Sequence, residues 1–305
     1  MLDIIGKRNW YFFVSLLVII PGVISLFLYG LKLSVEFTGG SRMTLIFPKE
    51  VNEKIVSQVR KAFAEEKVNV YTIQPAKNSV IIRTEPLQKQ EDIKILSSLE
   101  KEVGKFKQES FETIGPTIGK ETTRKAFYSV MIASVLIVLY IALSFRKVPK
   151  PASSWRFGIT AIIAVLHDVL LLVGIFSLLG HFYNVEIDSL FITALLTIIG
   201  FSVHDTIVVF DRIRENLLRV SGVSFEKIVN DSILQTIVRS LNTSLTALLV
   251  LFSLLLFGGE SIRWFIVALF IGILSGTYSS IFNAAPLLVV WHNWAMKKRE
   301  KSNTP

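Results

Sequence analysis

Six long apolar runs limit what this chain can fold into more than any other feature of its sequence. Each run is close to the length of about 20 residues that a helix needs to cross the hydrocarbon core of a bilayer. Lipid offers the backbone no hydrogen-bond partners, so such runs cross a membrane as helices. A hydrophobic fraction of 51% and a mean hydropathy of +0.53 support the same interpretation. We therefore predict a polytopic α-helical membrane protein with six transmembrane helices, near residues 11–29, 126–145, 157–179, 187–210, 241–257 and 264–290.

The first run follows Lys7 and Arg8, as the apolar part of a secretory signal peptide would. It is as long as a membrane span, it lacks a small-x-small end, and further spans follow it. Residues 1–30 are therefore expected to form an uncleaved first transmembrane helix.

The segment between the first two runs has mixed charge and short alternating patterns. These patterns predict a β-α-β-β-α-β order, which is that of a ferredoxin-like domain. The fold alone names no function. The expected strands lie at 43–47, 68–73, 80–84 and 106–114 and the helices at 51–64 and 88–103. The predicted organisation is a first helix, a ferredoxin-like α+β domain, a five-helix membrane bundle and a basic tail, at 1–30, 31–124, 125–296 and 297–305.

The net charge of +9 is explained mainly by membrane orientation. Lysine and arginine gather in the segments on one side, while the short turns at 181–186 and 258–263 on the other side contain only Arg263. By the positive-inside rule both termini are cytoplasmic and the ferredoxin-like domain is extracytoplasmic, in a multi-pass protein of the cytoplasmic membrane. No basic stripe interleaved with aromatic residues is present, so no nucleic-acid partner is expected. The absence of cysteine excludes disulfides, thiolate metal sites and cysteine nucleophiles.

Asp205 is the main functional candidate, because it follows His204 inside the apolar run at 187–210. A bare carboxylate at that depth costs a few kcal/mol or more, and it persists mainly where it faces protein, a partner charge or water. Arg239 opens the next span and could reach toward Asp205 if the helix begins with a cap at residues 230–232. A guanidinium that snorkels to the lipid headgroups, and a purely structural acid, are the alternatives.

Other polar residues inside the spans offer support for such a site: His204, Asp168, Asn242 and Thr243. Asp168 follows His167 at a depth comparable to that of Asp205, and a structural role for it is equally open. Two His–Asp pairs could suit zinc or manganese, but adjacent side chains diverge by about 100° and no third ligand lies at i+4. We therefore expect no metal and no other cofactor. Neither G-x-S-x-G nor H-E-x-x-H occurs, so no catalytic residues are assigned and the chain is not expected to be an enzyme.

A small residue recurs at every fourth position of the last span, at Gly272, Gly276, Ser280 and Ala284. Such a stripe lets helices approach closely, so a role in helix packing is the default interpretation.

Four motifs give the chain a family resemblance over nearly its whole length. It resembles the SecF family, the smaller of the paired SecD and SecF subunits, within the resistance-nodulation-division superfamily. The one departure is Glu36, where the family commonly has aspartate. The motifs are V-E-F-T-G-G at 35–40, I-G-P-T-I-G at 114–119, H-D-T-I-V-V-F-D-R-I-R-E-N at 204–216 and R-S-L-N-T-S-L-T at 239–246.

The resemblance implies a non-enzymatic auxiliary of protein export that uses the proton-motive force. Its implied partners are SecD, the SecYEG channel, the translocating polypeptide and membrane lipid. It assigns proton coupling to Asp205 and Arg239, and we expect a charge switch in which protonation of Asp205 removes its attraction to a cation and the helices repack. Two alternatives stay open, namely a small-molecule proton antiporter of the same superfamily and a structural scaffold of the translocon.

Overall fold

The computed structural model describes residues 2–146, 148–149, 152–220 and 222–302. The chain divides into two compact units, one formed by Met1–Lys32 with Ser129–Pro305 and the other by Leu33–Tyr128. The last residues of the expected basic tail, 303–305, lie outside the described residues.

Within the described residues, six helices are long and apolar enough to cross a membrane, as predicted. The last of them is continuous through a π-helical turn, η3 (Ser280–Ala284), which joins α9 (Arg263–Ser279) to α10 (Ala285–Ser302). The other five are α1 (Arg8–Tyr29), α5 (Pro116–Ser144), α6 (Ser154–Tyr183), α7 (Ser189–Arg219) and α8 (Phe225–Phe257).

Glycine permits a close helix approach in the membrane unit, where α1 crosses α6. A Cβ atom added to Gly22 would lie 2.8 Å from the Cα of Gly174, so the two backbones touch where neither residue has a side chain. One turn further on, the hydroxyls of Ser25 and Ser177 form a buried hydrogen bond of 2.9 Å. The first span is thereby fixed to the third, which is far from it in sequence.

α8 begins earlier than expected, so the predicted cap at residues 230–232 is wrong. Ser224 caps the helix, and its hydroxyl accepts the N–H of Lys227. Asn230 instead accepts the N–H groups of Ile4 and Ile5, and Ser232 accepts from Asn216. The first turns of the helix make polar contacts with the chain's own N-terminus and with α7, so they do not need an apolar sequence.

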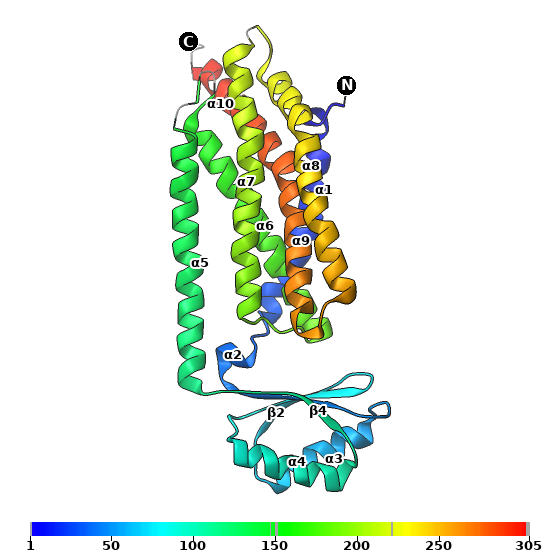
Figure 1. The fold of residues 1–305 in the computed structure, drawn as a ribbon. Helices are drawn as coiled ribbons and strands as arrows, with labels where there is room; N and C mark the ends of the chain where they lie inside the picture. Colours follow the sequence, from blue (N-terminus) through cyan, green and yellow to red (C-terminus); the bar gives the residue numbers. More distant parts are fainter. Residues whose placement is uncertain (1, 147, 150–151, 221, 303–305) are drawn as a thin grey trace. The chain divides into compact units, whose positions relative to one another are not determined.

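The second unit has the predicted ferredoxin-like order. Its four strands form one antiparallel sheet in the order β2-β3-β1-β4, and Figure 1 shows α3 and α4 on the same face of it. The core between them includes Met43, Leu45, Phe63 and Ile82, all almost fully buried. The elements are β1 (Gly40–Ile46), α3 (Glu53–Glu65), β2 (Val70–Pro75), β3 (Ser79–Thr84), α4 (Lys89–Val103) and β4 (Lys107–Ile114), preceded by the short α2 (Val35–Thr38).

Two of the four sequence motifs meet in this unit. A Cβ atom added to Gly119 would lie 2.8 Å from the backbone nitrogen of Gly39, and one on Gly40 would lie 2.7 Å from the carbonyl oxygen of Thr84. Gly39 and Gly40 also have φ angles of +73° and +118°, which side chains other than glycine's rarely adopt. Close packing and backbone conformation therefore explain Gly39 and Gly40 of V-E-F-T-G-G and Gly119 of I-G-P-T-I-G, whereas a Cβ atom on Gly115 would meet nothing within 4 Å.

Candidate functional site

Asp205 lies at a junction of three helical elements inside the membrane unit. Its side chain is buried on α7, and the residue is 7% exposed. The hydroxyl of Ser240 on α8 donates to Oδ1 at 2.5 Å, and the hydroxyl of Ser280 in η3 donates to Oδ2. Both carboxylate oxygens therefore have partners, and both partners are neutral.

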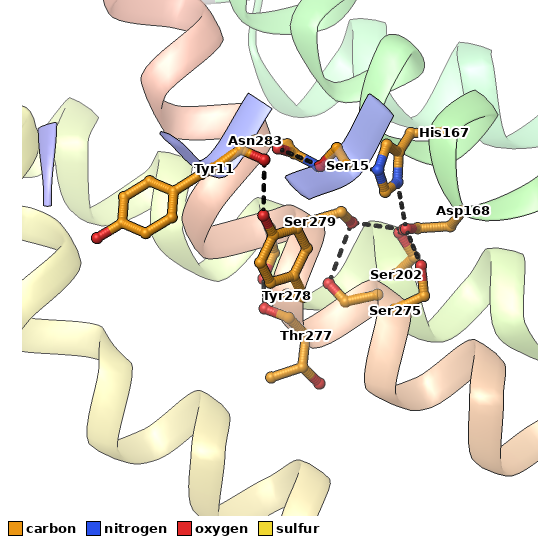
Figure 2. A network of polar contacts seen from close by, with 12 residues as sticks. Tyr11, Ser15, His167, Asp168, Ser202, Ser275, Thr277, Tyr278, Ser279 and Asn283 are labelled. Carbon is orange, nitrogen blue, oxygen red and sulfur yellow. Dashed lines mark hydrogen bonds and ion pairs between the residues drawn. The ribbon is translucent and has the colours of Figure 1, made fainter. Parts of the chain in front are cut away.

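Asp168 on α6 forms a second and more deeply buried polar cluster, with 1% of the residue exposed. Ser275 donates to Oδ1 at 2.7 Å, while Ser202 and Ser279 each donate to Oδ2 at 2.6 Å. The Nδ1 of His167 lies 3.0 Å from Oδ1, so these neighbours contact each other in spite of their divergence along the helix. Figure 2 shows these side chains converging on the carboxylate from three helices.

The polar network continues from His167 toward the first span. Its Nε2 atom lies 3.0 Å from Asn283 Nδ2, and Asn283 and Ser15 are hydrogen-bonded at 2.8 Å (Figure 2). Nearby, the hydroxyl of Tyr278 donates to the backbone oxygen of Tyr11 at 2.8 Å. Polar side chains of α1, α6, α7, α9 and η3 thus form a hydrogen-bonded interior within the bundle.

Arg239 is not brought to Asp205. Its side chain is exposed and makes no ion pair or hydrogen bond within the part of the chain that the structure describes. Ser240, the next residue, occupies the position beside Asp205, and adjacent side chains on a helix point about 100° apart. The expected direct Asp205–Arg239 contact is therefore absent from the described chain, and a serine stands in its place.

Three further candidates also lie on exposed surface: His204 on α7, and Asn242 and Thr243 on α8. Thr193 and Thr197 on α7 are exposed as well. The hydroxyls of both threonines, and that of Thr243, donate back to a carbonyl four residues earlier in their own helix. These residues bear polar groups on the outside of two membrane helices, and bare lipid is an unfavourable neighbour for such groups.

The small-residue stripe faces α7 within this chain. A Cβ atom on Gly272 would lie 2.2 Å from Ile198 Cδ1, and one on Gly276 would lie 3.2 Å from Ser202 Cβ. Ser280 contributes a hydrogen bond to Asp205 in addition to its small size. The stripe therefore brings the last span close to α7 and to Asp168 on α6, so that serine hydroxyls reach both acids.

Sequence reasoning missed the serines that contact the two acids, namely Ser202, Ser240, Ser275 and Ser279. The spacing of serines could have indicated them. Ser275 and Ser279 lie four residues apart, as do Ser240 and Ser244, so each pair shares one helix face. Among the described residues, no group of three or more histidine, aspartate or glutamate side chains comes together in the manner of a metal site.

Comparison with known proteins gives the chain close relatives. Residues 94–294 match the family model described as protein export membrane protein SecD/SecF, C-terminal, and residues 24–45 match the SecD/SecF GG motif. The protein translocase subunit SecF of Thermobaculum terrenum is 47% identical, with 96% of this chain and 95% of the relative covered. SecF of Anaerolinea thermophila is 39% identical with the same coverage.

Longer proteins match over part of their length. SecDF of Bacillus subtilis is 33% identical over 97% of this chain, which spans 39% of that protein. The crystal structure of SecDF from Thermus, described as a translocon-associated membrane protein, superposes with a TM-score of 0.82 at 35% identity. There the match covers 96% of this chain and 39% of the other.

Proposed function

Because this chain belongs to the SecD/SecF family of protein export membrane proteins, we propose that it pairs with a SecD subunit and uses the proton-motive force to promote export. Members of the family are translocase subunits and not enzymes, and this chain is an auxiliary component of Sec protein export. In the proposed arrangement it lies in the cytoplasmic membrane with both termini in the cytoplasm. Its outer domain then faces the emerging polypeptide, and the SecYEG channel and lipid are its neighbours.

The burial of Asp205 among neutral hydroxyls is the observation that carries this proposal. Within the described residues no lysine or arginine contacts it, so no ion pair in this chain fixes it in the ionised form. A serine hydroxyl can donate to a carboxylate and can also accept from a protonated carboxyl group. The same surroundings therefore accommodate both protonation states, as a proton-binding residue requires.

The exposed polar groups on α7 and α8 support a SecD subunit as the partner. Arg239, His204, Asn242 and Thr243 lie on helices that cross the membrane, yet their side chains are exposed in this chain. A partner helix with polar groups would remove the cost of exposing them to lipid. The fused SecDF relatives join a SecF-like part to a longer chain, which fits such a neighbour. Arg239 then acts at the subunit interface, and it remains with Asp205 in our proposed proton-coupling pair.

The work step follows from the loss of charge. When a proton from outside reaches Asp205, its carboxylate becomes a carboxyl group, its hydrogen bonds to Ser240 and Ser280 weaken, and α7, α8 and η3 repack. Each proton that crosses the membrane contributes about 2.3 kcal/mol per 100 mV. That amount can bias a two-state rearrangement that the outer domain follows.

The test is export into vesicles that contain this chain and its SecD subunit, with and without a proton gradient. Asp205→Asn should abolish the stimulation by the gradient while co-purification with SecD stays unchanged. Asp211→Asn is the matched control, because Asp211 lies on the same helix, is exposed and pairs with Arg214. If Asp205→Asn exports like the unmodified protein while Gly272→Leu does not, the chain is a scaffold and the proposal is wrong.

A further inference from the structure

Asp168 has no part in the function proposed so far, although it is the more deeply buried of the two membrane acids. Four side-chain groups surround its two oxygens, three of them serine hydroxyls from α7 and α9. A carboxyl group at such a position is costly unless it is well satisfied. The amount of polar structure around Asp168 therefore calls for an explanation beyond packing.

We propose that Asp168 is a second proton-binding residue and that Ser279 and Ser280 couple its charge state to that of Asp205. The proposal rests on the proposed role of Asp205 as the proton-responsive group, and it assigns a partner to that residue within the same chain.

The first step of the argument is that Ser279 and Ser280 each have two acceptors within reach. The hydroxyl of Ser279 lies 2.6 Å from Asp168 Oδ2 and 3.2 Å from the carbonyl oxygen of Gly276. The hydroxyl of Ser280 contacts Asp205 Oδ2 and lies 3.0 Å from the carbonyl oxygen of Thr277. One hydroxyl has one proton to donate, so each serine can turn from its acid to its own helix.

The second step concerns what happens when an acid takes up a proton. An ionised carboxylate only accepts hydrogen bonds, whereas a protonated carboxyl group must donate one. A serine that then turns its proton to the backbone carbonyl frees a lone pair to accept from the acid. Within the described chain the hydroxyls of Ser202 and Ser275 donate only to Asp168, so Ser279 is the one of the three serines that has an alternative acceptor.

The third step is the position of the two serines. They are consecutive residues at the start of the π-helical turn, and one reaches an acid on α6 while the other reaches an acid on α7. π turns are rare and frequently lie at functional sites. Because one peptide bond joins the two serines, a backbone shift that lengthens one contact also moves the other. The turn therefore links the two acids mechanically.

His167 connects Asp168 to polar side chains of the first span and of the π-helical turn. Its Nδ1 lies 3.0 Å from Asp168 Oδ1, and its Nε2 lies 3.0 Å from Asn283 Nδ2. His167, Asn283 and Ser15 also line a cavity of about 250 Å³ between α1, α6 and the middle of the last span, whose other lining residues are apolar. Among the described side chains that hydrogen-bond to Asp168, His167 is the titratable one and the other three are serines, so no lysine or arginine is among them (Figure 2).

The experiment is an infrared titration of the chain with its SecD subunit in lipid vesicles, which reads the carboxylic-acid band as the pH is varied. Bands lost in Asp168→Asn and in Asp205→Asn identify the two acids. Removal of the negative charge by Asp205→Asn should lower the proton affinity of Asp168 roughly tenfold, as is typical for coupled sites. Asp168→Asn should change the affinity of Asp205 by the same factor, because coupling of equilibrium binding is reciprocal.

The serine pair is tested in the same titration. Ser279→Ala with Ser280→Ala should reduce the mutual effect of the two acids to roughly twofold or less, against the tenfold effect expected with both serines. Ser177→Ala is the matched control, since Ser177 is equally buried and bonded to Ser25 and Gly30. Asp168→Glu should still titrate.

Two results would overturn the inference: an Asp168 that keeps one protonation state throughout the pH range, or a titration of Asp168 that Asp205→Asn leaves unchanged. Because the measurement uses no export, its outcome is separate from that of the export test.

Discussion

The contact of Gly272 with Ile198 allows the packing of α7 and α9 to be tested quantitatively. A Cβ atom on Gly272 would lie 2.2, 2.4 and 2.8 Å from three atoms of the Ile198 side chain. Isoleucine is β-branched and has little rotamer freedom in a helix, so one rotation cannot relieve all three overlaps. Overpacking of this kind costs about 1–3 kcal/mol. Exchange of glycine for alanine inside a helix otherwise gains about 1 kcal/mol.

Gly200→Ala isolates the overlap from helix propensity. Gly200 lies on α7, and a Cβ atom there would meet nothing within 4 Å. The free energies of unfolding of Gly272→Ala and Gly200→Ala should therefore differ by about 1–3 kcal/mol, with Gly272→Ala the less stable. The assay is a denaturing-detergent titration of the purified chain, followed by the loss of helical circular dichroism.

A double-mutant cycle identifies the contact responsible. Ile198→Ala alone should cost about 2–5 kcal/mol, because it leaves a cavity between α7 and α9. Combined with Gly272→Ala, it removes all three overlapping atoms, and the new methyl group fills part of the cavity. The double variant should be more stable than the sum of the single effects by at least about 1 kcal/mol. Additivity within about 0.5 kcal/mol would refute the packing argument.

Two further predictions concern the ferredoxin-like domain. Gly40→Ala should destabilise that domain by about 1 kcal/mol or more, because residue 40 has a φ of +118° and its Cβ atom would meet the Thr84 carbonyl. Hydrogen exchange of β1 and β3 measures the effect, and unchanged protection of these strands would contradict the prediction. Burial raises the pKa of Asp92 above its ordinary value, against a smaller opposing effect of its hydrogen bond from Gln108. The folded domain then holds the proton more tightly than the unfolded chain, so this residue's contribution to stability falls as the pH rises from the ordinary aspartate pKa through the raised one. Asp92→Asn should flatten that acidic part of the stability profile and stabilise the domain at neutral pH, as read from the protection of α4 against exchange; a profile that stays unchanged would rule this out.

The sequence predicted what depends on local pattern. Apolar length located all six spans. Alternating runs and amphipathic helices predicted the order of elements in the ferredoxin-like domain, because burial of one face leaves a period in the sequence. The burial of Asp205 was also predictable. An acid with apolar residues on both sides lies within the membrane, where a carboxylate is stable mainly when it faces the interior of the bundle.

The rotation of each helix about its own axis was not predictable. A shift of one residue changes the facing direction by about 100°, which is why Ser240 and not Arg239 meets Asp205. The serines around Asp168 also gave little warning, because a hydroxyl is close to neutral in hydropathy and tolerated on any face of a membrane helix. The π turn has no local sequence signature that we could use. Its relation to Asp168 and Asp205 follows only from the three-dimensional contacts of Ser279 and Ser280.

The crossing of α1 and α6 sets the order in which the membrane unit can be assembled. Ser25 and its partner Ser177 are separated by 152 residues, and the ribosome adds about 5–20 residues per second. The first span therefore waits in the bilayer for about 8–30 s before the helix that it fits has been made. During that interval Gly22 and Ser25, which later contact α6, are accessible to other helices in the membrane. The chain contains no cysteine, so Ser25→Cys with Ser177→Cys would report the moment of docking by disulfide formation in nascent chains of increasing length. Crosslinks that appear only long after α6 has emerged would show that another partner holds the first span in the meantime.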